Sequence, residues 1–203
     1  MSIPFQDSET AKNLLRAFAG ESQARNRYDF AANLCQKQEL QAMAFIFQAT
    51  AKQEQAHAKV FWDHLQALNG QNLPIYGAYP IEGTNRILEL LRAAQHNEHE
   101  EHGSVYPSFA AIATQEGFPE AAASFRQIAA IEQLHGERFG LLADQLESGT
   151  LFVSQIETGW MCLNCGHTQN SLEAPKQCPV CNHGQGWFIR LELAPWSPVI
   201  KQT

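Results

Sequence analysis

Two Glu-x-x-His motifs lie within long apolar helical patterns of this chain, 78 residues apart: Glu54-Gln-Ala-His57 and Glu132-Gln-Leu-His135. In a helix this spacing places the carboxylate and the imidazole on one face, one turn apart. Apolar residues precede and follow each motif at intervals of three and four, which predicts that the face is buried. A buried carboxylate costs several kcal/mol unless a partner compensates its charge. The motifs therefore indicate a compensating ion inside a helical core.

Four helical patterns of this kind fill residues 1–149. We expect helices from Ser8 to about Lys37, from Glu39 to Leu68, from Thr84 to Glu116 and from Pro119 to Ser148. Pro107 removes one backbone hydrogen bond from the third pattern and should kink that helix. The second and third patterns are joined by a long segment, 70–83, whereas the other links are short. This order predicts an all-α four-helix bundle with a single crossover.

The first and third helices also carry glutamate in the middle of their apolar stripes. Glu21 lies in the first stripe, and Glu98 and Glu101 lie in the third. An error of one residue in helical phase would place any one of them in solvent, but it does not explain four helices at once. Together with the Glu-x-x-His motifs, these residues match the ligand pattern of di-iron or di-manganese carboxylate bundles.

The two halves of the bundle repeat each other. The matching pairs are Glu21 and Glu98 at an offset of 77, and Glu54 and Glu132, His57 and His135, and Tyr28 and Tyr106 at an offset of 78. Such a repeat predicts one helical hairpin used twice. Two metal ions related by the same pseudo-twofold axis would have equivalent ligands.

Four of the five cysteines form two Cys-x-x-Cys pairs, Cys162 with Cys165 and Cys178 with Cys181. Two such pairs supply four thiolates to one tetrahedral metal. Their spacing leaves zinc and iron open, and taken without context it favours zinc. So short a segment needs a metal to fold. We expect its aromatic residues to pack around the metal: Trp160, Trp187, Phe188 and Trp196.

Charge and hydropathy narrow the possible partners. The formal net charge is −7, which argues against nucleic acid or an anionic membrane surface as the main partner. No apolar run approaches the ~20 residues that a membrane span needs. The segment Met1–Asp7 has neither the basic nor the apolar region of an export signal, so we expect a cytoplasmic protein.

In these motifs the chain resembles the rubrerythrins. The resemblance extends over nearly the whole chain, from Leu15-Arg-Ala-Phe-Ala-Gly-Glu21 and Tyr28, through Glu54-x-x-His57, Glu98-x-x-Glu101 and Tyr106-Pro107, to Glu132-x-x-His135 and both cysteine pairs. It implies a ferritin-like di-iron bundle over residues 1–149, followed by a small rubredoxin-like metal-binding β/loop domain over residues 150–203. It also favours iron over zinc in the four-cysteine site.

The resemblance further implies a role for each site residue. The bridging ligands of two irons would be Glu54 and Glu132, and the terminal ligands would be Glu21, Glu98, Glu101 and His135. One iron would exchange Glu101 for His57 on reduction. Tyr28 and Tyr106 would hydrogen-bond to ligand carboxylates. Four other helix histidines are expected to be solvated and not to be ligands: His64, His96, His99 and His102.

The activity implied by the resemblance is that of a non-haem di-iron peroxidase, which reduces hydrogen peroxide in oxidative-stress defence. Its electrons would come from an NADH-dependent rubredoxin reductase or a rubredoxin, and the chain would form a head-to-tail homodimer. Two alternatives stay open: a ferritin-like iron oxidation and storage protein with a structural zinc-ribbon tail, and a metal-dependent sensor with a zinc ribbon. A visible spectrum distinguishes them, because four-thiolate ferric iron is red and a zinc ribbon is colourless.

Overall fold

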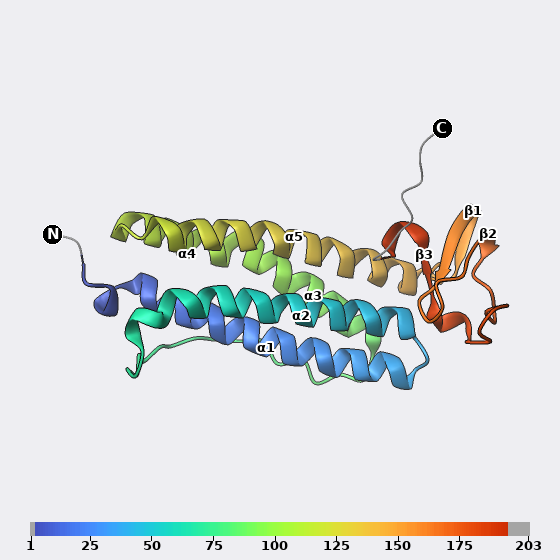
Figure 1. Ribbon diagram of the computed structural model, residues 1–203, viewed down its shortest axis with the longest axis horizontal. Helices are drawn as coiled ribbons and strands as arrows, with labels where there is room; N and C mark the ends of the chain where they lie inside the picture. Colours follow the sequence, from blue (N-terminus) through green and yellow to red (C-terminus); the bar gives the residue numbers. More distant parts are fainter. Residues whose placement is uncertain (1–2, 195–203) are drawn as a thin grey trace.

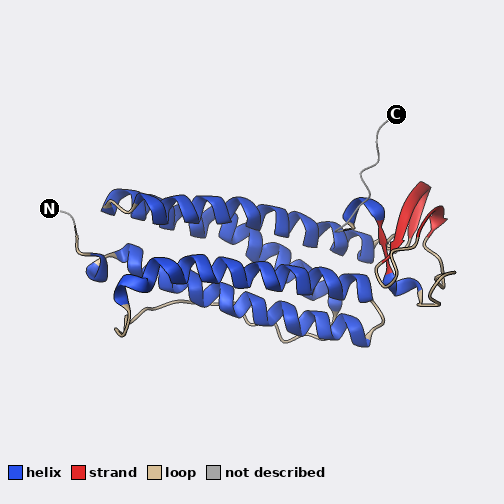
Figure 2. Cartoon of the chain, in the orientation of Figure 1, coloured by secondary structure: helices blue, strands red, loops and turns tan. Residues whose placement is uncertain are grey.

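The computed structural model describes residues 3–194 as a bundle of long helices with a small sheet at one end (Figures 1 and 2). The helices are α1 Glu9–Lys37, α2 Gln41–His64, α3 Ile87–Glu100, α4 Tyr106–Glu116 and α5 Pro119–Glu147. The strands are β1 Val153–Cys162, β2 Thr168–Glu173 and β3 Phe188–Arg190. The predicted class, an all-α bundle with a small C-terminal β/loop unit, is confirmed. Within the described range, no helix is both long and apolar enough to span a membrane.

The ends of the first two helices follow local signals. The Ser8 hydroxyl accepts a hydrogen bond of 3.0 Å from the Ala11 N–H and caps α1. The second helix is shorter than predicted, because α2 begins at Gln41 and ends at His64. A 3₁₀ turn, Leu65–Leu68, continues the chain to the crossover.

The third predicted helix consists of three segments. It begins at Ile87 and not at Thr84, and α3 ends at Glu100. A π-helical segment, η3, covers Glu101–Val105, and α4 follows it. Pro107 lies in the first turn of α4, where its missing N–H is accommodated by the change from π to α hydrogen bonding. The helical segment thus continues past Pro107, with a π turn directly before this residue.

Two helical hairpins make up the bundle. The helix α1 packs along α2, and α5 packs along α3 and α4. The crossover, residues 69–86, runs along the length of the bundle without forming a helix or strand (Figure 1). The apolar core is divided into two clusters, one around Phe47 and Phe139 and the other around Phe61 and Phe125. The predicted ionisable residues lie on the same buried stripes, between these clusters.

The C-terminal unit is a three-stranded antiparallel sheet in the order β2-β1-β3. Trp160 and Phe188 are buried beside two of the cysteines, Cys162 and Cys178, and Trp187 packs against this group. These three aromatic residues are placed as predicted. The fourth, Trp196, lies outside the described residues.

The C-terminal unit packs against the bundle at the α1–α2 turn (Figure 1). Met161 and Ile189 join the apolar cluster of the bundle that contains Met43. Gly186 makes the closest approach, because a Cβ on this residue would lie 1.7 Å from the carbonyl oxygen of Glu39. Only a glycine permits this contact of two backbones.

Candidate metal centres

Six ionisable side chains from four helices converge in the middle of the bundle. They are Glu21, Glu54, His57, Glu98, Glu132 and His135, and each is at most 6% exposed. Their ligand atoms form two groups, each within 4.8 Å: Glu21, Glu54, His57 and Glu132 in one, and Glu54, Glu98, Glu132 and His135 in the other. Glu54 and Glu132 belong to both groups. A ligand shared by two ions must occupy a position of this kind.

The two shared carboxylates each turn one oxygen toward each histidine. His57 Nδ1 lies 2.9 Å from Glu54 Oε2 and 2.9 Å from Glu132 Oε1. His135 Nδ1 lies 3.0 Å from Glu54 Oε1 and 2.9 Å from Glu132 Oε2. The site therefore has the pseudo-twofold symmetry that the repeat predicts.

Two tyrosines hold the outer carboxylates of the cluster. Tyr28 Oη donates a hydrogen bond to Glu98, and Tyr106 Oη donates one to Glu21. Both bonds connect α1 with the other hairpin. Burial and the neighbouring carboxylates raise the pKa of each tyrosine well above its ordinary value. Both hydroxyls therefore stay protonated and act as donors.

Several buried atoms of the cluster point inward without a partner in hydrogen-bond geometry. They are Glu21 Oε2, Glu54 Oε1, Glu98 Oε2, both carboxylate oxygens of Glu132 and His135 Nδ1. A buried polar atom left unpaired costs about 1–3 kcal/mol. Carboxylate and imidazole together suit iron or manganese. The residues present therefore fit a pair of divalent ions.

The pKa values of the cluster show that protons compete with metal for these ligands. Burial alone would lower the pKa of His57, but the Glu132 and Glu54 carboxylates, each 2.9 Å from its Nδ1, raise that pKa to about 9. The Glu132, Glu54 and Glu98 carboxylates around His135 Nδ1 raise the pKa of His135 to about 12. Burial raises the pKa of Glu98 to about 8, with a contribution from nearby carboxylates. Metal uptake must therefore release protons.

The π segment accounts for a one-residue change in the internal repeat. Glu98 follows Glu21 by 77 residues, whereas Tyr106 follows Tyr28 by 78. The segment η3 lies between Glu98 and Tyr106, and a π turn holds one residue more than an α turn. The change of offset from 77 to 78 is thus a signal in the sequence by which the π segment could have been predicted.

Glu101 lies in this additional turn and differs from the other predicted ligands. It is half-buried and belongs to neither group of four, so the structure brings together six of the seven predicted bundle residues. His57 is inside the cluster while Glu101 lines a cavity next to it. Residues 77 and 78 positions before Glu101 are Ala24 and Gln23, neither of which is acidic. Glu101 therefore has no counterpart in the first hairpin.

Gln53 belongs to the site although no sequence pattern indicates it. His135 Nε2 lies 2.9 Å from Gln53 Oε1. If this nitrogen carries the proton and donates, the lone pair of Nδ1 is left free for a metal ion, and the ring is oriented as a metal ligand requires. The corresponding residue of the second hairpin is Ile131, which cannot accept such a bond.

The four additional helix histidines belong to neither group of bundle ligands. His96 and His99 are exposed, as predicted. His64 and His102 are only half-buried, and each has another partner: His64 Nε2 is 2.9 Å from Ser124 Oγ, and His102 Nδ1 is 2.8 Å from the carbonyl oxygen of Ala129.

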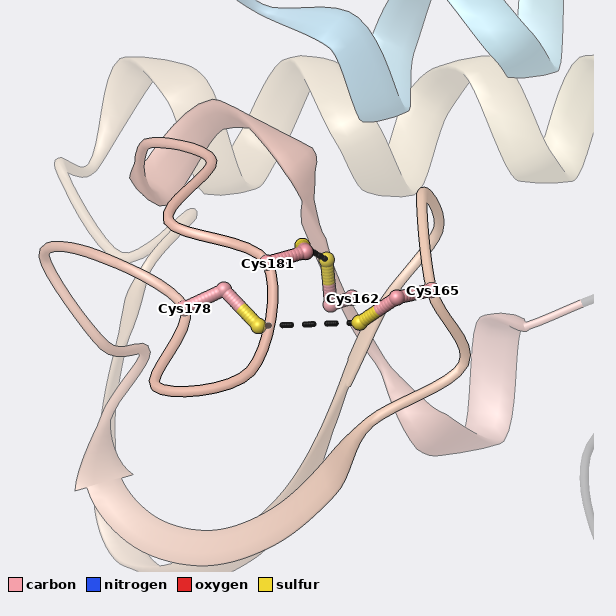
Figure 3. A group of neighbouring side chains, drawn as sticks. All are labelled: Cys162, Cys165, Cys178 and Cys181. Atoms are coloured by element: carbon pink, nitrogen blue, oxygen red, sulfur yellow. Dashed lines mark hydrogen bonds between the residues drawn. The ribbon is translucent and has the colours of Figure 1, made fainter.

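The second centre consists of four cysteines on two loops, which face one another beside the sheet (Figure 3). None of the four forms a disulfide. The Sγ atoms of Cys162 and Cys181 are 3.7 Å apart, as are those of Cys165 and Cys178. A tetrahedral metal with metal–sulfur bonds of about 2.3 Å requires sulfurs about 3.8 Å apart. The four thiols therefore fit one tetrahedral ion.

The two cysteine loops share one backbone geometry. Cys162 N–H donates to the carbonyl oxygen of His167, and Cys178 N–H donates to that of His183, both at 2.8 Å. A backbone N–H of His183 also hydrogen-bonds to the Cys181 sulfur and lowers its pKa to about 5. Such backbone donors favour the thiolate form that binds a metal.

Comparison with protein families agrees with both centres. A family model described as rubrerythrin matches residues 12–143, and a model of the rubrerythrin rubredoxin-like domain matches residues 160–189. The chain belongs to the rubrerythrin family. A rubrerythrin contains a di-iron site and a rubredoxin-like four-cysteine site, and the two clusters are groups of residues that could hold these metals.

Similar proteins cover nearly the same length. The rubrerythrin of Porphyromonas gingivalis is 44% identical over 188 residues, which are 93% of this chain and 92% of that protein. The rubrerythrin of Nitratidesulfovibrio vulgaris is 40% identical over 186 residues, 92% of this chain and 96% of that protein. A structure of partially reduced nigerythrin covers 91% of this chain and 90% of its own, with a TM-score of 0.61 and 24% identity, and supports the fold.

Rubrerythrins are di-iron proteins of oxidative-stress defence, so family membership makes this chain an oxidoreductase. Family membership and the structural similarity confirm the expected ferritin-like fold, and family membership confirms the expected presence of a di-iron site and a rubredoxin-like iron site.

Proposed function

We propose that this rubrerythrin is a peroxidase that reduces hydrogen peroxide to water, with electrons entering through the rubredoxin-like site. The observation that carries the proposal is the presence of two different centres in one chain, a cluster with two shared carboxylates and a four-thiolate site. When bound, two ferrous ions supply the two electrons that break the O–O bond, and the four-thiolate iron restores them one at a time. One peroxide, two electrons and two protons give two water molecules.

In this proposal Glu54 and Glu132 would hold both irons, because each turns one oxygen toward each half of the site. The terminal ligands are Glu21, Glu98, His135 and, in exchange with each other, His57 and Glu101. The position of His57 inside the cluster supports its role as the ligand that would replace Glu101 on reduction.

The protein also positions ligands and holds protons. Tyr28 and Tyr106 fix Glu98 and Glu21 through hydrogen bonds. Burial and the nearby carboxylates raise the pKa of Glu101 well above its ordinary value. Without metal the protonated carboxyl of Glu101 is therefore favoured, and two bound ions would favour its ionised form, which can act as a ligand.

The long distance between the C-terminal unit and the ligand cluster of the same chain favours electron transfer between the subunits of a head-to-tail homodimer. Gly186 of the C-terminal unit contacts the bundle next to Leu40. The distance along α2 from Leu40 to Glu54 is about 21 Å, at ~1.5 Å per residue. Electron transfer slows steeply with such a distance. In the proposal, residues 1–149 form the catalytic domain, and residues 150–203 of one subunit dock beside the di-iron site of its partner. The donor is an NADH-dependent reductase or a rubredoxin.

Stopped-flow reoxidation tests the reaction type. Protein that is loaded with iron and chemically reduced should be reoxidised faster by hydrogen peroxide than by dioxygen. A red visible spectrum first verifies that the cysteine site holds iron and not zinc. If dioxygen reacts faster and iron accumulates as mineral, the chain is a storage protein.

Subunit mixing tests the electron route. Cys178→Ser removes one of the four cysteines of the rubredoxin-like site, and Glu132→Ala removes a carboxylate shared by both halves of the bundle site. Neither variant alone should support reductase-driven peroxidase activity, but mixed dimers should recover part of it. Absence of recovery after verified subunit exchange would show that electrons do not pass between subunits.

A further inference from the structure

A cavity of about 300 Å³ lies next to the cluster, between α1, α4 and the crossover. Its outer part is formed by exposed crossover residues, among them Gly77 and Pro80. Its inner part is formed by half-buried Glu101 and fully buried Tyr106, whose hydroxyl donates to Glu21. The cavity therefore extends from solvent to residues that touch the ligand cluster.

The crossover is held in place on both sides of Tyr79. Arg16 Nε donates to the carbonyl oxygen of Tyr76 at 2.8 Å, and Tyr79 Oη donates to the carbonyl oxygen of Arg16 at 3.0 Å. Further along, Glu82 pairs with Arg27 at 3.2 Å. The Tyr79 ring is thus a fixed part of the cavity wall.

Two glycines leave room around this ring. A Cβ on Gly77 would lie 2.9 Å from Tyr79 Cε2, so a larger residue would displace the ring. A Cβ on Gly20 would lie 3.6 Å from Tyr79 Cε1 and 4.0 Å from Glu101 Oε1. A methyl group would fit there, but it would occupy the space between the ring and the carboxylate. Because glycine within a helix is less stable than alanine by about 1 kcal/mol, folding alone does not favour Gly20 in α1.

We infer that this cavity is the entrance for the oxidant, that Gly20 keeps it open and that Tyr79 limits its width. The identity of the oxidant rests on the proposed function, whereas the route rests on the cavity. Arg16 and Arg27 also line the cavity, and each is paired with a carboxylate, Glu9 and Glu82 respectively, so the wall suits small polar molecules. A larger groove of about 720 Å³ between α1 and α2 is lined by none of the cluster residues.

Azide binding to the diferric protein measures access without turnover. Stopped-flow absorbance follows both its association and its dissociation. Gly20→Ala should slow both rates roughly tenfold and leave the dissociation constant unchanged, because a narrower passage adds the same barrier in both directions. Gly103→Ala is the matched control, since a Cβ on Gly103 meets nothing within 4 Å.

An unchanged association rate in Gly20→Ala would overturn the inference. A changed dissociation constant would do so as well, because Gly20 would then shape the bound state and not the route. If azide slows as expected but the wild-type protein does not reduce peroxide, the entrance stands and the proposed function fails.

A bulkier oxidant tests the limit on width. Tyr79→Ala should speed reoxidation by tert-butyl hydroperoxide relative to hydrogen peroxide by roughly tenfold. Tyr79→Phe keeps the ring and should keep the wild-type ratio. Gly77→Ala displaces the ring without removing it and should shift the ratio in the same direction as Tyr79→Ala. An unchanged ratio in both alanine variants would show that Tyr79 does not limit the width.

Discussion

His57 and His135 lie nearly parallel across the cluster, with 5.8 Å between ring centroids and 21° between ring planes. They are 78 residues apart in the chain, and each faces one oxygen of Glu54 and one of Glu132. The repeat in the sequence is therefore a repeat in space, with the shared carboxylates on its axis.

Glu54→Ala should remove most metal from the bundle, because the lost carboxylate faces both ion positions. Glu21→Ala should remove about one ion, since Glu21 belongs to only one group. Elemental analysis of iron-loaded protein gives the counts, with three ions per chain expected for wild type. Glu137→Ala, an exposed change on α5, is the control. Retention of two bundle ions without Glu54 would contradict a bridging role.

Metal-free protein should lose stability as pH rises from about 5 to about 9. The folded cluster raises the pKa of Glu98 from 4.5 to about 8 and that of His57 from 6.5 to about 9. The folded state then binds more protons than the unfolded state. The stability that protonated Glu98 and protonated His57 contribute is therefore present at low pH, and it is lost as the pH rises through the pKa that each residue has in the folded protein. Thermal unfolding with a chelator present, at a series of pH values, measures the trend.

Glu98→Gln provides the control for this pH dependence, because glutamine does not titrate. The variant should flatten the fall in Tm between about pH 5 and pH 8 but keep the part due to His57. A Tm of the metal-free wild type that rises over this range would contradict the proton-bound cluster.

Loss of either tyrosine hydroxyl should destabilise the iron-loaded protein to a similar extent. Tyr28→Phe and Tyr106→Phe each remove the donor to a buried carboxylate, at a cost of about 1–3 kcal/mol. Chemical denaturation measures the change in the free energy of unfolding. Tyr76→Phe is the control, because Tyr76 is 86% exposed. An effect in only one of the two buried variants would show that the two hairpins are not energetically equivalent.

Gly186→Ala should detach the C-terminal unit from the bundle without unfolding either part. The added Cβ cannot lie 1.7 Å from the Glu39 carbonyl oxygen, so the two backbones must separate. Limited proteolysis between Glu147 and Val153 should become faster, while the iron content stays the same. Gly184→Ala, where a Cβ meets nothing within 4 Å, is the matched control. Equal cleavage of the two variants would contradict the contact.

The parts of the fold that the sequence predicts are those with local causes. Ser8 can cap α1 with its own hydroxyl, and Gly117 ends α4 at a positive φ of 86°. The buried ligands are recognisable because a glutamate such as Glu132 interrupts an otherwise apolar stripe. Each of these features can be recognised from the few residues around it in the sequence.

The features that were not predicted depend on distant contacts. The π turn of η3 leaves only a one-residue change of repeat offset in the sequence, and Tyr106 beyond it bonds to Glu21 on another helix. Gln53 meets His135, which is 82 residues away in the chain. The crossover near Tyr79 has no periodic pattern, so its contact with Arg16 could not be inferred from spacing.

The second hairpin holds one residue more than the first, at the place where the two differ most. A gene for one helical hairpin, duplicated and joined through a connecting segment, would already encode both halves of the ligand set. One extra residue in the second copy, within η3, accompanies Glu101 and the opening beside it on that side only. Two metal positions with equivalent ligands can in this way acquire different tasks, one facing the incoming molecule and one enclosed, while every shared ligand is inherited unchanged.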